Sequence, residues 1–106
     1  MSENSDVTYP LLRALTRLPD ALFYRQQCGR FRTLDGRRVV ATTSIDGIAD
    51  IMGVFRGRPV AIETKTLAGK QRETQRRFQH AFEKAGGLYL IARAVDDAIK
   101  ELINAT

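Results

Sequence analysis

Cysteine and histidine are almost absent from this sequence. Cys28 is its one cysteine and His80 is its one histidine. A single cysteine cannot form a disulfide bond within the chain. A structural zinc site is also excluded, because such a site needs a group of Cys and His ligands.

Long hydrophobic runs are lacking as well. No apolar stretch approaches the roughly 20 residues that a membrane-spanning helix requires. The first residues contain neither the basic segment nor the apolar segment of a secretory signal peptide. We therefore expect a cytoplasmic protein that has no membrane partner.

Negative charge is scarce relative to positive charge. The chain has 17 Lys and Arg against 12 Asp and Glu, a formal net charge of +5. Most of the positive charge is arginine, whose planar fork suits phosphate oxygens. This pattern indicates a phosphate-binding surface, although an ordinary solvated surface is the alternative. The clustered cations are Arg25, Arg30, Arg32, Arg37, Arg38, Arg56, Arg58, Lys70, Arg72, Arg76 and Arg77.

The length and composition indicate one globular domain. Of the 106 residues, 43% are apolar and 27% are charged, which is typical of a soluble folded protein. A chain of this length can enclose one hydrophobic core but not two. We therefore expect a single domain over residues 1–106.

Residue patterns in the first half of the chain predict a helix followed by strands. Leucines at helical spacing predict a helix over residues 8–17, with Thr8 as its N-cap. Apolar and β-branched residues predict strands over 21–25 and 38–43. A basic loop or hairpin is expected between Gly29 and Gly36.

The second half predicts a hairpin, two helices and a buried strand. Residues 48–66 are typical of a β-hairpin with its turn at residues 56–59. Amphipathic spacing predicts helices over 71–85 and 95–104, and an apolar run predicts a strand over 88–92. This order of elements favours an α/β fold in which α-helices flank a mixed β-sheet.

Two acidic residues and a lysine could meet on this sheet. Glu63 and Lys65 lie two apart on a predicted strand, so they share one face. If Arg56 pairs with Pro59, Asp50 lies opposite Lys65 on the same face, whereas a slip of one residue would turn Asp50 away. Two carboxylates with water and substrate phosphate suit Mg²⁺, which can polarise a phosphodiester. A cross-strand ion pair without catalytic function is the alternative.

The sequence GIADIMG over residues 47–53, followed by GRPVAIETK over residues 57–65, resembles the VRR-NUC family (virus-type replication-repair nucleases). This family belongs to the PD-(D/E)XK nuclease superfamily. The resemblance continues through Gly69, Lys70 and Gln75 to RAVDDA over residues 93–98, and covers most of the chain from residue 23 onward. It implies a restriction-endonuclease-like core and a metal-dependent deoxyribonuclease.

The resemblance also implies a role for each site residue. Asp50, Glu63 and the backbone carbonyl of Thr64 would bind Mg²⁺, for which Mn²⁺ can substitute. Lys65 would be the catalytic lysine, and Gln75 would support the site from the following helix. A further acidic ligand near the start of the first helix is assigned to Glu3, with Asp6 close by.

Two positions depart from the superfamily pattern, and neither removes a metal ligand. Ala49 stands where the superfamily has proline, and Thr64 stands where valine is common. Activity is therefore still expected.

DNA is the partner that the resemblance and the charge imply. We expect structure-selective cleavage of branched DNA such as Holliday junctions, by a homodimer whose symmetry matches that of the junction, in a bacterial or phage-infected cell. The candidate DNA contacts are Arg25, Arg30, Arg58, Lys70, Arg72 and Arg76. Two alternatives stay open: a non-catalytic nucleic-acid-binding module with the same fold, and a basic interaction subunit without a nucleic-acid role.

Overall fold

A computed structural model describes residues 7–26, 30–41 and 45–106, except for the side chains of residues 30–32 and 39–41. Its elements are α1 (Tyr9–Leu15), β1 (Ala21–Arg25), β2 (Arg30–Arg32), β3 (Val39–Ala41), β4 (Ile51–Phe55), β5 (Arg58–Thr64), α2 (Glu73–Lys84), β6 (Leu88–Ala92) and α3 (Val95–Ala105). The protein is therefore mixed α/β, as predicted. Within the described ranges, no helix has the length and apolar character needed to cross a membrane.

Four strands form the main sheet, in the order β1-β4-β5-β6. The pairs β1–β4 and β4–β5 are antiparallel, whereas β5–β6 is parallel, so the sheet is mixed. A parallel pair needs a crossover between its strands, and α2 provides it. The predicted mixed sheet with flanking helices is confirmed at this level.

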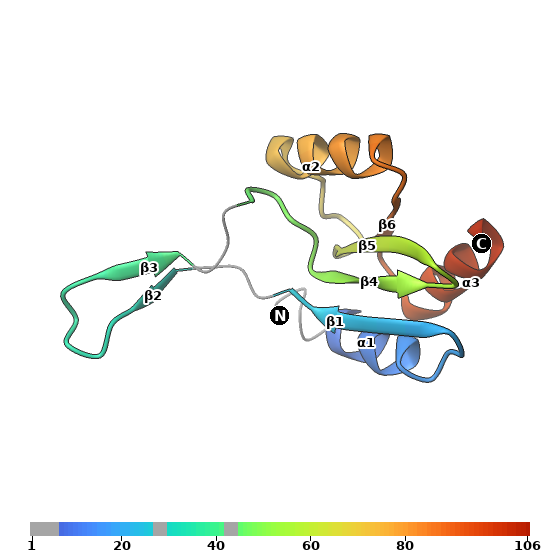
Figure 1. Ribbon diagram of the computed structural model, residues 1–106, viewed down its shortest axis with the longest axis horizontal. Helices are drawn as coiled ribbons and strands as arrows, with labels where there is room; N and C mark the ends of the chain where they lie inside the picture. The colour runs from blue at the N-terminus through green and yellow to red at the C-terminus, as the bar shows by residue number, and fades with distance from the viewer. Residues whose placement is uncertain (1–6, 27–29, 42–44) are drawn as a thin grey trace.

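The two faces of the sheet are covered unequally. On one face, α1 and α3 pack over the larger core, which includes Leu11, Phe55 and Leu102. On the other face, α2 packs over a smaller cluster formed by Ala49, Ala61 and Tyr89. Figure 1 shows α2 and α1 on opposite sides of the sheet.

The turn between β4 and β5 differs from the prediction. Its central residues are Arg56 and Gly57, both with positive φ, and Phe55 pairs with Arg58. Two-residue hairpin turns of this kind match the twist of the strands and favour Gly at the second position. The predicted turn, centred on residues 57–58, was wrong. The register therefore moves by two residues, which brings Asp50 opposite Glu63 instead of Lys65 and leaves it on the same face.

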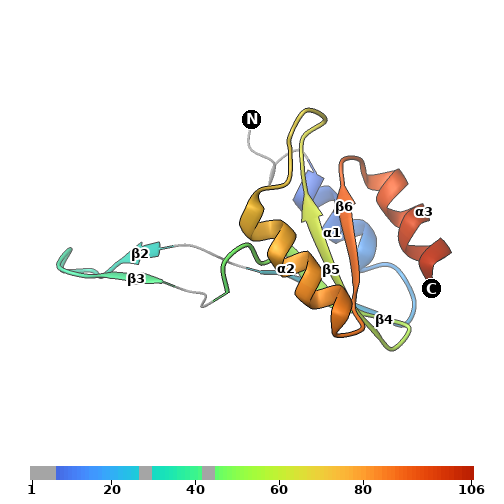
Figure 2. The same cartoon turned by 90° about the horizontal axis from the view of Figure 1, so that it is seen from above.

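Several predicted boundaries were also wrong. Residues 48–50 precede β4 and are not in a strand. The first helix is shorter than predicted, and the Thr8 side chain does not cap it. The strand predicted over 38–43 is limited to β3 among the described residues, and it pairs with β2 in a separate two-stranded sheet. Figures 1 and 2 show this hairpin extending away from the main sheet.

A substitution at Gly53 tests the pairing of β1 with β4. A Cβ atom at this position would overlap the carbonyl oxygen of Leu22 and lie 2.6 Å from Cδ1 of Phe23. We expect Gly53→Ala to lower the free energy of unfolding by about 1–3 kcal/mol, as overpacked substitutions do, in chemical denaturation. Val54→Ala, on the exposed side of the same strand, is the control and should cost less than about 1 kcal/mol. Equal stability of Gly53→Ala and the wild type would contradict the register.

Candidate active site

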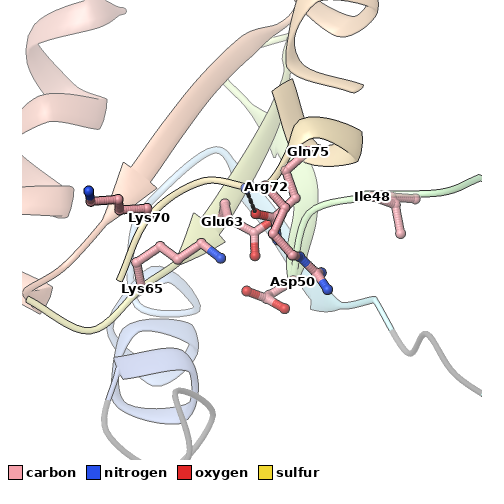
Figure 3. A pocket seen from close by; sticks show the side chains of 7 residues that line it. All are labelled: Ile48, Asp50, Glu63, Lys65, Lys70, Arg72 and Gln75. Atoms are coloured by element: carbon pink, nitrogen blue, oxygen red, sulfur yellow. Dashed lines mark hydrogen bonds between the residues drawn. The ribbon is translucent and has the colours of Figure 1, made fainter. Parts of the chain in front are cut away.

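A cleft of about 470 Å³ opens where β5 ends and α2 begins. Its lining consists of Ile48, Asp50, Glu63, Lys65, Lys70, Arg72 and Gln75. Figure 3 shows the carboxylates of Asp50 and Glu63 and the amine of Lys65 pointing toward one another. The four residues predicted to be catalytic therefore line one cleft: Asp50, Glu63, Lys65 and Gln75.

The strand β5 supplies Glu63, and Lys65 follows directly after its end. Glu63 is 1% exposed and Lys65 is 5% exposed. Both lie on the face that α2 covers, because side chains of a strand alternate and Ala61 packs on that face. No ion pair joins Lys65 to Asp50 in the part of the chain that the structure describes.

Asp50 is held in place by hydrogen bonds to its neighbours on both sides. Its Oδ2 accepts bonds from the Thr64 N–H at 2.9 Å and from the Thr64 hydroxyl at 2.8 Å. Its backbone carbonyl accepts a bond from the N–H of Gln26 at 2.7 Å. These bonds fix Asp50 between the ends of β1 and β5, although it lies just outside β4.

The loop before Asp50 packs directly on the first turn of α2. Gly47 has a φ of +75°, and a Cβ atom there would overlap the carbonyl of Thr74 and lie 2.6 Å from the N atom of Gln75. Only glycine can adopt this positive φ without strain and also has no Cβ atom to overlap Thr74. This close approach brings the loop that carries Asp50 against the helix that carries Gln75.

Gln75 lies at the third position of α2 and is 3% exposed. Its Oε1 accepts a hydrogen bond from the N–H of Arg72 at 2.8 Å, drawn in Figure 3. The residue at this helix position often caps the preceding backbone in this way. Gln75 therefore stabilises the helix start while it lines the cleft.

The backbone carbonyl of Thr64 faces the same side as Asp50. The N–H of Lys65 donates to the carbonyl of Ala92 in β6 at 2.9 Å. No cis peptide bond is found among the described residues, and the C=O and N–H of a trans peptide point in opposite directions. The Thr64 carbonyl therefore points away from β6, toward Asp50.

The donor set fits a hard divalent cation. Two carboxylates and one carbonyl, with water and phosphate completing the shell, are typical of Mg²⁺ sites. Among the described residues there is no group of three or more His, Cys, Asp or Glu that could hold a metal. Glu3 and Asp6, the candidates for a further acidic ligand, lie outside the described residues, as does Cys28.

Two of the six candidate DNA contacts line the cleft, and four do not. Lys70 and Arg72 line the cleft, and Figure 3 shows the Lys70 amine pointing away from the three converging groups. Arg58 lies at the other end of β5 and donates from Nε to the Gly86 carbonyl at 3.4 Å. Arg76 and Glu73, both with exposed side chains on α2, form an ion pair at 3.0 Å.

The two remaining candidates lie near the start of the projecting hairpin. The guanidinium of Arg25 is 5.3 Å from the ring centroid of Tyr9. Arg30 begins β2, but its side chain is outside the described set. Neither residue lines the cleft.

Two residues hold the site together in a way that was not predicted from the sequence. Thr8 was predicted to cap α1, yet its hydroxyl oxygen lies 2.5 Å from that of Thr64. Arg93 donates from Nη1 to the carbonyls of Thr66 at 2.7 Å and Gly69 at 2.6 Å, which fixes the loop after Lys65. Both contacts join residues far apart in the chain, so no local pattern reveals them.

Tyr89 lies in the small core beside the cleft. Burial raises its pKa to about 12, and the charges of Glu63 and Asp50 add to this effect, while a hydrogen bond from Gln71 opposes it. A tyrosine whose pKa is higher in the folded state stabilises the fold below pH 10, and this contribution is lost as the pH rises toward 12.

We therefore expect the free energy of unfolding to fall more steeply between pH 10 and 12 in the wild type than in Tyr89→Phe. Denaturant titrations at a series of pH values measure this difference. The variant keeps the ring and loses the ionisable group. Parallel curves of the free energy of unfolding against pH would therefore contradict the raised pKa of Tyr89.

Comparison of the chain with protein-family models and with curated proteins finds no match.

Proposed function

We propose that this protein is a divalent-metal-dependent deoxyribonuclease of the VRR-NUC type. The observation that carries this proposal is that Asp50, Glu63 and Lys65 line one cleft. Their convergence matches the chemistry of phosphodiester hydrolysis, which needs a metal site and a group that stabilises charge on the phosphate. The basic composition supports a polyanionic substrate.

Asp50, Glu63 and the carbonyl of Thr64 would hold Mg²⁺ or Mn²⁺. Such an ion, when bound, polarises a phosphoryl oxygen and lowers the pKa of water. Asp50 and Glu63 orient their carboxylate oxygens into the cleft. The restraint that Thr64 and Gln26 place on Asp50 supports this function, because preorganised ligands bind with less loss of entropy.

Lys65 would position the attacking water and offset the negative charge that develops on the phosphate. An amine that is 5% exposed has few competing water contacts, so its interaction with an anion is stronger than at the surface. The Oε1 of Gln75 already accepts a hydrogen bond from the N–H of Arg72. Its side-chain NH2 group would therefore be the one that orients the same water or the substrate. These roles assign one function to each polar group inside the cleft.

DNA would enter along the surface that carries Lys70 and Arg72. The projecting β2–β3 hairpin provides a second contact region, where Arg37 and Arg38 are exposed. Arg25, Arg30, Arg58 and Arg76 would add contacts to phosphates outside the cleft. A small domain with two separated contact regions suits branched DNA, such as a four-way junction, and a symmetric homodimer would cut two of the four strands of the junction.

Cleavage should require a divalent cation. We expect Mg²⁺ and Mn²⁺ each to support cutting of four-way DNA, and excess chelator to abolish it, because the proposed ligands are hard oxygens. Linear and flapped DNA serve as substrate controls, and Glu63→Gln as the protein control. Full activity in chelator would overturn the metal site. Binding of DNA without cleavage in any metal would favour the non-catalytic module, and absence of both would favour a basic interaction subunit.

Replacement of Lys65 by Met separates the catalytic from the structural hypothesis. Met keeps most of the side-chain volume and removes the charge. We expect Lys65→Met to bind DNA and lose cleavage by on the order of 100-fold or more, with unchanged or slightly higher stability. A structural ion pair predicts the reverse, namely retained cleavage and lower stability.

Single-turnover cleavage, junction binding and melting temperature should be measured on one preparation of this variant. Lys100→Met, an exposed change on α3, is the matched control and should alter none of them. A stable Lys65→Met that cuts at the wild-type rate would refute the assignment of Lys65.

A further inference from the structure

Two buried hydroxyl groups connect α1 to Asp50. Thr8 and Thr64 are both 0% exposed, and their hydroxyl oxygens lie 2.5 Å apart. The Thr64 hydroxyl in turn lies 2.8 Å from Oδ2 of Asp50. The three side chains therefore form a continuous hydrogen-bonded chain from the first helix to the cleft.

The number of protons available decides which group is the donor in each of these two hydrogen bonds. An ionised carboxylate accepts hydrogen bonds and cannot donate them, and each threonine hydroxyl has one proton to donate. The Thr64 hydroxyl must therefore donate to Asp50. Thr8 must then be the donor to the Thr64 oxygen, since the Thr64 proton is already used.

This arrangement orients the carboxylate of Asp50. Its Oδ2 receives two donors from one residue, the N–H and the hydroxyl of Thr64. Among the described residues, no such donor reaches Oδ1, the oxygen that remains for a cation. A carboxylate held at one oxygen presents the other in a fixed direction, as hydrogen bonds around metal-binding carboxylates commonly do.

The core next to Thr8 is apolar. The residues around it in the larger core are apolar, including Val7, Leu11 and Leu15, and the Thr8 side chain does not cap α1. Valine would fill the same volume without burying a hydroxyl, which costs free energy unless it is hydrogen-bonded. The contact with Thr64 is one that valine at this position could not make.

We propose that Thr8 is a positioning residue that acts through Thr64 to orient Asp50 for metal binding. This role rests on the proposed function, because it requires Asp50 to be a metal ligand. It predicts that a buried hydroxyl, which does not line the cleft, controls the affinity of the cleft for a divalent cation.

The test is the dissociation constant for Mn²⁺, measured by electron paramagnetic resonance on the full chain without DNA. We expect Thr64→Val to weaken binding by about 10- to 100-fold and Thr8→Val by up to about tenfold, as loss of groups behind a metal ligand does. Thr8→Ser keeps the hydroxyl and should restore the affinity. Thr16→Val is the matched control, because the Thr16 hydroxyl bonds only within the α1 region, to the Arg13 carbonyl, and its affinity should be that of the wild type.

The double variant distinguishes positioning from a general loss of structure. If Thr8 acts through Thr64, adding Thr8→Val to Thr64→Val should change the Mn²⁺ affinity no further. Unchanged affinity in a folded Thr8→Val, or full additivity in the double variant, would overturn the role of Thr8 and leave the proposed function standing. Absence of saturable Mn²⁺ binding in the wild type would overturn the proposed function and this role together. Thermal melting of each variant confirms that the protein measured is folded.

Discussion

The antiparallel pairing of β4 with β5 is the interaction on which the candidate site depends. Asp50 immediately precedes β4, whereas Glu63 and Thr64 belong to β5 and Lys65 follows it. The short turn at Arg56 and Gly57 sets the register, which places Asp50 next to Glu63 and Thr64. A slip of one residue would put Asp50 on the opposite face from Glu63 and Lys65, so the turn and the site are coupled.

One face of the sheet carries the larger apolar core, and the opposite face carries the candidate site. The face under α1 and α3 encloses the larger apolar core, which supplies most of the burial. The opposite face has a smaller apolar cluster and the cleft, where Glu63 and Lys65 are nearly inaccessible to solvent. Burial of charged groups costs free energy unless partners compensate for it. The larger core can offset this cost because it lies across the sheet and is undisturbed by the charges.

The start of α2 links helix formation to the geometry of the cleft. Gln75 completes the backbone hydrogen bonding of the helix start, and Gly47 lets the loop before Asp50 touch the same turn. Lys70 and Arg72 precede this turn, so the cations of the cleft are placed by the same segment. One local arrangement therefore positions groups that come from three parts of the chain.

The sequence by itself determined the kinds of element and their order, and it predicted six of the residues that line the cleft. Alternation along a strand requires Glu63 and Lys65 to share a face, and helical spacing identifies α2 and α3 within two residues of their bounds. These properties depend on local periodicity, which is present in the chain before it folds. The tertiary structure decided the turn, the register opposite Asp50, the separation of β2 and β3 from the main sheet, and the bond between Thr8 and Thr64. Each of these depends on contacts between residues distant in sequence, whose free energies no local pattern contains.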